Sequence, residues 1–218
     1  MSKIDFKRTM KALYVPSSKV FSIVDVPPMQ FLMIDGHGDP NTAPAYQQAL
    51  AALYAVAYRC KFVSKRALER DYVVPPPEGL WWAAEMDVFS SRDKSAWDWT
   101  MMIMQPEWVT RAMVDEARAQ AGGELPATVK LRLETYHEGL SVQILHVGSY
   151  DDEAPTIARM HGEFMPAHGL VPAGKHHEIY LSDPRRVAPE KLKTVLRQPV
   201  RRHVLGVHAG DGRRFVIV

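Results

Sequence analysis

The chain has 218 residues, of which 46% are hydrophobic and 24% charged, as in an ordinary globular protein with a sizeable core. Lys and Arg total 27 against 25 Asp and Glu, and this balance argues against the basic face of a nucleic-acid-binding protein. No segment approaches the roughly 20 apolar residues that cross a bilayer, and no N-terminal apolar run resembles a signal peptide. Cys60 is the only cysteine, so no internal disulfide forms, and we expect a cytoplasmic protein without membrane or direct nucleic-acid contacts.

The first predicted unit spans about residues 19–106. Alternation over residues 20–26 and an apolar run over 29–35 flank Pro27-Pro28 and predict a hairpin that runs into Gly36. Pro44 opens a predicted helix. Its expected buried stripe consists of Leu50, Leu53, Tyr54, Ala57 and Tyr58. Two more strands are predicted at residues 79–89 and 97–104, the second ending at Gln105-Pro106.

The second predicted unit, about residues 128–200, repeats this order. Alternating Val129, Leu131 and Leu133 and the run over residues 140–147 predict its hairpin. A helix follows Pro155, with a stripe of Ile157, Met160, His161, Phe164 and Met165. Strands are predicted at residues 176–182 and 192–197, and the second again ends at a Gln-Pro pair, Gln198-Pro199.

This repetition predicts the domain organisation. A linking helix is expected over residues 107–121, and residues 201–218 form a C-terminal extension with a hairpin of its own. The predicted fold class is α+β, in a single domain over residues 1–218. It is built from duplicated strand-helix-strand-strand units with pseudo-twofold symmetry, and the seam between the units is the expected ligand cleft.

The most informative stretch is residues 174–185, because it places Glu178 in a strand-like alternation. Side chains alternate between the faces of a strand, so His176, Glu178 and Tyr180 share one face. We expect this face to carry chemistry, and the face of His177, Ile179 and Leu181 to pack. In a cavity wall, burial would raise the pKa of Glu178, and Tyr180 would be its same-face donor. The alternative is a surface carboxylate paired with Lys175 or His176.

Four of the five tryptophans lie in the predicted strands of the first unit, namely Trp81, Trp82, Trp97 and Trp99. Alternation directs some of these rings toward whatever the sheet covers. Aromatic walls suit flat or cationic ligands, and each stacking or cation–π contact contributes about 0.5–2 kcal/mol. For any single ring, filling of the core is an equally simple interpretation.

The motifs that would indicate a metal site, a dinucleotide loop or a nucleophile elbow are incomplete in this sequence. His176 and His177 project to opposite faces of a strand and cannot both reach one ion, so we predict no metal site. Gly36-His37-Gly38 lacks the further glycine of a dinucleotide loop, and Ser141 lacks the second glycine of a nucleophile elbow. We therefore expect no cofactor and no acyl-enzyme chemistry.

Taken together, six segments resemble the GyrI-like small-molecule-binding family. They are residues 27–36 (PPMQFLMIDG), 78–82 (EGLWW), 97–103 (WDWTMMI), 142–150, 174–185 and 193–200. The resemblance implies a duplicated strand-helix-strand-strand fold with a groove between the halves. In that groove a central glutamate, matched here by Glu178, faces hydrophobic and often cationic drugs. The chain is similar to free-standing members of the family, some of which hydrolyse cyclopropanoid DNA-alkylating compounds, and it shows no helix-turn-helix segment.

Two functions remain open on this basis. The first is binding of aromatic or cationic xenobiotics with hydrolysis of a reactive cyclopropanoid electrophile. Glu178 would then be the acid/base or cation-stabilising group and Tyr180 its orienting donor. The expected ligand contacts are Trp81, Trp97, Trp99, Tyr136, His146 and His176. The second is a non-catalytic module that sequesters a drug or binds a protein partner such as gyrase. Nucleic-acid binding ranks third.

Overall fold

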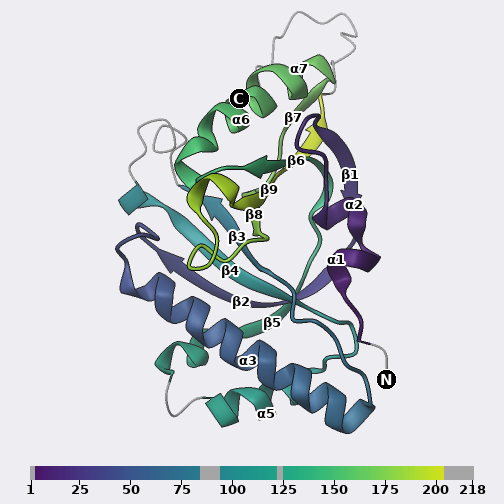
Figure 1. Ribbon diagram of the computed structural model, residues 1–218, viewed down its shortest axis with the longest axis vertical. Coiled ribbons are helices and arrows are strands. Elements are labelled where there is room, and N and C mark those ends of the chain that lie inside the picture. The colour runs from purple at the N-terminus through teal and green to yellow at the C-terminus, as the bar shows by residue number, and fades with distance from the viewer. Residues whose placement is uncertain (1–2, 84–93, 122–124, 204–218) are drawn as a thin grey trace, which may run out of the picture.

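The computed structural model describes residues 3–83, 94–121 and 125–203. The fold is mixed α/β, with a nine-stranded antiparallel sheet and a few helices (Figure 1). The strands are β1 (Ser22–Val26), β2 (Met29–His37), β3 (Pro77–Trp82), β4 (Asp98–Gln105), β5 (Arg132–Tyr136), β6 (Gly139–Val147), β7 (Leu170–Pro172), β8 (His176–Tyr180) and β9 (Lys193–Arg202). The predicted C-terminal hairpin, and the part of the strand predicted at 79–89 that follows residue 83, lie outside the described residues.

Apart from α3 and α5, the helices in the described part of the chain are short. The α-helices are α1 (Phe6–Thr9), α2 (Lys11–Tyr14), α3 (Pro44–Leu68), α5 (Arg111–Ala121), α6 (Ala154–Arg159) and α7 (Met165–Ala167). A π-helical turn, η4 (Met160–Phe164), joins α6 to α7. Short 3-10 turns are η1 (Lys94–Ala96), η2 (Pro126–Lys130), η3 (Tyr150–Asp152) and η5 (Pro189–Lys191).

The sheet has the order β1-β6-β9-β8-β3-β4-β2-β5, with β7 added to β9. The order reads the same from either end if β1 is exchanged with β5, β2 with β6, β3 with β8 and β4 with β9. At its centre β3 pairs with β8, and Gly79 lies opposite Glu178. The duplication expected from the sequence stays a prediction, although its two units contribute equally to this order.

Helix α3 packs on one face of the sheet through a stripe of small residues. Ala49, Ala52, Leu53, Val56, Ala57 and Cys60 are all buried against that face. The predicted stripe is wrong at Tyr58, which is 49% exposed. Leu50 and Tyr54 are only half-buried. Alanines allow the helix to approach the sheet closely. The buried face is therefore the one that carries the alanines, and the large residues of the predicted stripe, such as Tyr58, lie partly outside it.

Three boundaries also differ from the predictions. Helix α5 begins at Arg111 rather than at residue 107, because a turn closed by the Val109 amide and the Pro106 carbonyl (2.9 Å) precedes it. Val129 lies in η2 and is 79% exposed, so it does not begin the strand. Strand β9 continues through Pro199 to Arg202, because the Pro199 carbonyl still accepts a hydrogen bond, from the Ala173 amide at 2.8 Å.

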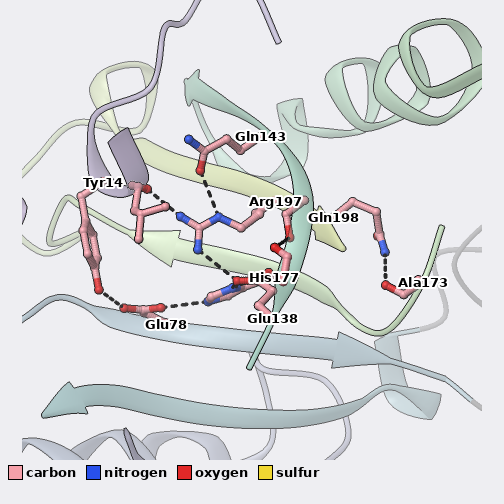
Figure 2. A network of polar contacts seen from close by, with 11 residues as sticks. Tyr14, Glu78, Glu138, Gln143, Ala173, His177, Arg197 and Gln198 are labelled. Atoms are coloured by element: carbon pink, nitrogen blue, oxygen red, sulfur yellow. Dashed lines mark hydrogen bonds and ion pairs between the residues drawn. The ribbon is translucent and has the colours of Figure 1, made fainter. Parts of the chain in front are cut away.

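A buried ionic network lies on the face of β8 that carries His177 (Figure 2). The two ring nitrogens of His177 lie 2.9 Å from a Glu78 oxygen and 3.0 Å from Glu138. Only a doubly protonated ring donates to both carboxylates. Burial opposes this charge, but the Glu138 and Glu78 carboxylates outweigh it and raise the pKa of His177 to about 9. This face packs through Ile179, as expected, whereas the apolar surroundings expected for His177 are wrong.

Arg197 of β9 connects the network to β6 and α2. Its guanidinium donates to Glu138 (3.1 Å), to the Gln143 side chain (3.0 Å) and to the Leu13 carbonyl (2.6 Å). The Tyr14 hydroxyl donates to the other oxygen of Glu78 at 2.9 Å. The side chains of His177, Glu78, Glu138 and Arg197 are at most 1% exposed. The network therefore ties α2, β3, β6 and β9 to β8, the strand that carries Glu178.

Replacing Arg197 by Met removes one cation and leaves Glu138 and Gln143 short of a donor. Loss of one partner from a buried pair costs about 3–5 kcal/mol. We expect the Arg197→Met variant to lose this amount of unfolding free energy in urea. Arg186→Met is the control, since that side chain is 84% exposed and should change stability by less than about 1 kcal/mol. Equal stabilities of the two variants would contradict this role of the network.

Candidate functional site

A cavity of about 670 Å³ is lined by the start of α3, by α6 and by the central strands β3 and β8. Trp81 of β3 and Glu178 and Tyr180 of β8 line it from the sheet. Its other lining residues are Pro40, Asn41, Tyr46, Gln47, Lys94, Trp97, Tyr150, Asp151, Glu153, Ala154, Ile157 and Ala158. This volume lies within the range of pockets that enclose small-molecule ligands.

A chain of hydrogen bonds orients Glu178 in this cavity. The Trp81 indole donates to the Tyr180 hydroxyl oxygen at 3.0 Å, and the Tyr180 hydroxyl donates to a Glu178 oxygen at 2.6 Å. The Glu178 side chain is 15% exposed. Burial raises the pKa of Glu178, while the bond from Tyr180 and the positive charges of His177 and Lys94 oppose the rise. The carboxylate is thus held in one orientation at the wall of the cavity.

Gly79, directly opposite Glu178 on β3, gives the Trp81 indole its position. A Cβ atom at residue 79 would lie 2.8 Å from the Trp81 ring nitrogen. Such a contact is too short, so any other side chain would displace the indole that donates to Tyr180. The Gly-Leu-Trp spacing in residues 79–81 was the available sequence signal, which strand alternation alone does not identify.

A second carboxyl group in the cavity, Glu153, was missed by the sequence analysis. It precedes α6, is 4% exposed, and its Oε1 atom has no hydrogen-bond partner among the described residues. Burial and the nearby charge of Glu178 raise the pKa of Glu153 to about 9. Glu153 therefore holds a proton at neutral pH, and the hydrogen bond from Tyr180 favours the ionised form of Glu178 over that of Glu153. From its sequence context, Asp151-Asp152-Glu153 before Pro155, it resembles an ordinary acidic helix start.

Aromatic rings form much of the cavity wall. The Trp81 and Trp97 rings meet edge to face at 5.7 Å, and Tyr150 meets Tyr180 in the same way at 5.7 Å. Tyr46 lies 6.1 Å from Trp81. Trp81 and Trp97 were expected at the ligand. Tyr46 and Tyr150 were not, because Tyr46 lies in α3 and Tyr150 in η3, where strand alternation gives no information.

The structure places four other predicted ligand contacts outside this cavity lining. Trp99 is 1% exposed in the core, where its indole donates to the Gly38 carbonyl at 3.2 Å. Tyr136 lies on the edge strand β5 and packs against Phe31. His146 is buried, with its ring 3.1 Å from the Ser149 carbonyl. His176 lies 3.6 Å from Glu178, but burial lowers its pKa to about 4, so at neutral pH it carries no charge for an ion pair.

Within the described residues, no group of three or more His, Cys, Asp or Glu side chains is placed to hold a metal ion. The helices of that part of the chain are also too short or too polar to span a bilayer. The site is an aromatic cavity with two buried carboxyl groups, Glu153 and Glu178, and this lining is typical of a small-molecule-binding protein.

Residues 20–201 match the GyrI-like family, described as a GyrI-like small molecule binding domain. Because this match covers most of the chain, the chain belongs to the GyrI-like family, and the resemblance seen in the sequence is confirmed. No protein of curated function matches this sequence.

Several solved structures are similar to this chain. An uncharacterized conserved protein from Listeria innocua is 42% identical, with a TM-score of 0.84, over 91% of this chain and 100% of its own. A hydrolase from Listeria innocua is 41% identical, with a TM-score of 0.80, over 92% of this chain and 100% of its own. The EcmrR C-terminal domain shares the fold alone, at 10% identity and a TM-score of 0.51, over 84% of this chain and 98% of its own.

The raised pKa of Glu153 makes stability depend on pH. In the unfolded chain the group ionises near its ordinary pKa of 4.5, so between that pH and about 9 unfolding releases its proton. Stability from this group is therefore complete below pH 4.5 and falls as the pH rises toward 9. We expect a rise from pH 6 to 8.5 to destabilise the native chain by about 1–3 kcal/mol more than the Glu153→Gln variant, measured by urea unfolding. Parallel pH profiles of the two proteins would contradict the assignment.

Proposed function

We propose that this chain binds hydrophobic aromatic or cationic small molecules in the cavity and hydrolyses reactive cyclopropanoid electrophiles, acting in the cytoplasm, where Cys60 stays reduced. The observation that carries the proposal is the pair of carboxyl groups, Glu178 and Glu153, in one aromatic cavity, where burial and the charge of Glu178 raise the pKa of Glu153 to about 9. Such a pair provides a general base and a general acid at the same pH. Similar proteins of Listeria innocua are described as hydrolases, at 41–42% identity, which supports a hydrolytic reaction.

We also infer that residues 19–106 and 128–200 are two copies of one unit. The palindromic strand order supports this duplication, with the β3–β8 pair at its midpoint. Glu178 and its partner Gly79 then lie close to the pseudo-twofold axis. The cavity is the seam between the two copies, where each copy contributes one helix and one central strand.

In the proposed reaction, water adds across one bond of a cyclopropane that is conjugated to a carbonyl group. The oxygen of the water molecule bonds to a ring carbon, and Glu178 accepts a proton from that water. The strained C–C bond breaks, and its electron pair moves through the conjugated system to the carbonyl oxygen. Glu153 donates its proton to that oxygen, which gives a hydroxyalkyl enol or phenol. The product equals substrate plus water, and a proton returns from Glu178 to Glu153 to reset the pair.

Tyr180 and Trp81 would serve this reaction by orientation. The Tyr180 hydroxyl fixes one oxygen of Glu178 and leaves the other to face the water. Because Trp81 donates to Tyr180, the hydroxyl proton is directed at Glu178 rather than elsewhere. The Trp81 and Trp97 rings hold the flat conjugated part of the substrate by stacking.

The Glu178→Gln variant tests the reaction. Loss of a general base costs about 100- to 10,000-fold in rate, so we expect kcat for hydrolysis of a cyclopropane-fused cyclohexadienone to fall by that factor, with ligand affinity largely kept. Product formation is followed by liquid chromatography. Glu190→Gln is the matched control, because that side chain is exposed in η5, and it should leave kcat unchanged. Full activity of the Glu178→Gln variant would refute the role of this carboxylate.

The alternative is a non-catalytic module that sequesters a drug. It is favoured by the position of the Glu178 carboxyl group among aromatic rings, since a carboxylate and aromatic faces together hold a flat organic cation without any reaction. Both functions predict quenching of Trp81 and Trp97 fluorescence by the ligand, whereas only the hydrolase forms product. Saturable quenching by the electrophile with no excess of ring-opened product over a protein-free sample would establish the alternative.

A further inference from the structure

The strand order of the sheet ends at β1 on one side and at β5 on the other, and these two edges expose different side chains (Figure 1). Strand β5 carries an ion pair between Arg132 and Glu134 at 2.6 Å. Charged side chains on an edge strand discourage pairing with another chain. The middle of β1 is apolar instead, and Ile23 is 44% exposed there. Among the described residues, no strand pairs with the outer side of β1.

The side chains of β1 alternate between two faces of the sheet. Phe21, just before the strand, packs in the apolar cluster that contains Leu196, and Leu196 lies opposite Glu178 on β8. Cross-strand partners share a face, so Phe21 lies on the face of the sheet that carries the cavity. Val24 packs on the other face, in the cluster that includes part of α2. Because side chains alternate, Ile23 shares the cavity face with Phe21.

Opposite charges flank the apolar residues of this edge. Lys19 is exposed in the bend before β1, and Asp25 is exposed near the end of the strand. Neither side chain forms an ion pair with another residue in the described part of the chain. The two charges lie three residues to either side of Ser22, in the segment Lys-Val-Phe-Ser-Ile-Val-Asp. This segment is thus complementary to a reversed copy of itself.

An antiparallel second copy of β1, related by a two-fold axis at Ser22, matches every one of these positions. Ile23 then lies opposite the partner's Phe21, and Asp25 lies opposite the partner's Lys19. Apolar pairs and pairs of opposite charge both stabilise neighbouring strands, and the two-fold axis makes each pair twice. A register centred on Phe21 puts Lys19 opposite Ile23, and one centred on Ile23 puts Asp25 opposite Phe21. Both alternatives set a charge against an apolar side chain.

We propose that two copies of this chain associate through β1, in an antiparallel pair centred on Ser22 that joins their sheets into one. The two-fold axis is perpendicular to the sheet, so the cavities of both copies lie on the same face of the joined sheet. The bend at residues 18–20 and the Pro27-Pro28 pair limit the pairing to a few residues. Such a small interface gives a weak dimer, which forms as the protein concentration rises.

Cysteine cross-linking tests the register. Cys60 is the only cysteine of the chain and is fully buried, so an introduced surface cysteine is the only accessible thiol. In Ser22→Cys the two new thiols lie opposite each other at the two-fold axis. We expect mild oxidation to give a disulfide-linked dimer on a non-reducing gel. Thr135→Cys is the matched control, because Thr135 is exposed on β5 at the other edge, and this variant should stay monomeric.

Charge exchange tests the pairs at the two ends of the interface. In Asp25→Lys each proposed ion pair becomes a pair of lysines, so we expect the dimer dissociation constant, measured by sedimentation velocity, to rise about tenfold or more. The double variant Lys19→Asp, Asp25→Lys restores opposite charges and should return to within about threefold of the native value. Both side chains are exposed, so each variant should unfold in urea at the native midpoint.

A native chain that stays monomeric up to high micromolar concentration, with no more cross-linking in Ser22→Cys than in Thr135→Cys, would overturn the proposal. A dimer that Asp25→Lys leaves unchanged would overturn it as well, because that dimer uses another surface. A double variant that dimerises as weakly as Asp25→Lys would refute the register centred on Ser22.

Discussion

The candidate site depends on the pairing of His177 with two buried carboxylates. Removing a charged imidazole from water costs several kcal/mol, and only close, well-directed anions offset this cost. Glu78 and Glu138 do so from opposite sides of the ring, and Arg197 in turn compensates Glu138. Because Glu78 belongs to β3 and His177 to β8, the pairing joins the two strands that carry Trp81, Glu178 and Tyr180 into the cavity.

The two faces of β8 therefore hold charge in opposite ways. On the His177 face, every charge has a partner in hydrogen-bonding distance, and that face contributes to rigidity. On the Glu178 face, two carboxyl groups share a cavity lined by a single lysine, Lys94. Incomplete compensation there raises the pKa of both carboxyl groups and keeps a proton on Glu153. The chemistry proposed for the cavity arises from this imbalance, and the rigid opposite face keeps it in place.

Local patterns predicted much of the fold. Proline and glycine marked the turns, and period-two alternation identified strands β1, β2, β5, β6 and β8, because these signals depend on backbone geometry within a few residues. The pairing within the two predicted hairpins is wrong, because β1 pairs with β6 and β2 pairs with β4 and β5. The same alternation correctly put Glu178 and Tyr180 on one face. Alternation did not predict that Trp99 is buried in the core, since it relates neighbours along a strand but does not say which face of the sheet is hollow. The π turn at residues 160–164 and the small-residue stripe of α3 also left no clear local signal.

The sequence by itself determined the order of strands and helices, the family, and a carboxylate with a tyrosine two residues later. The element order and the spacing of the two residues are local properties of the sequence, and the family follows from the sequence as a whole. Only the tertiary structure decided that Glu153, 25 residues before Glu178 in the chain, faces the same cavity, and that His177 is a buried cation rather than an apolar contact. Proton affinity depends on distance and burial in space, and neither quantity is a property of sequence neighbours.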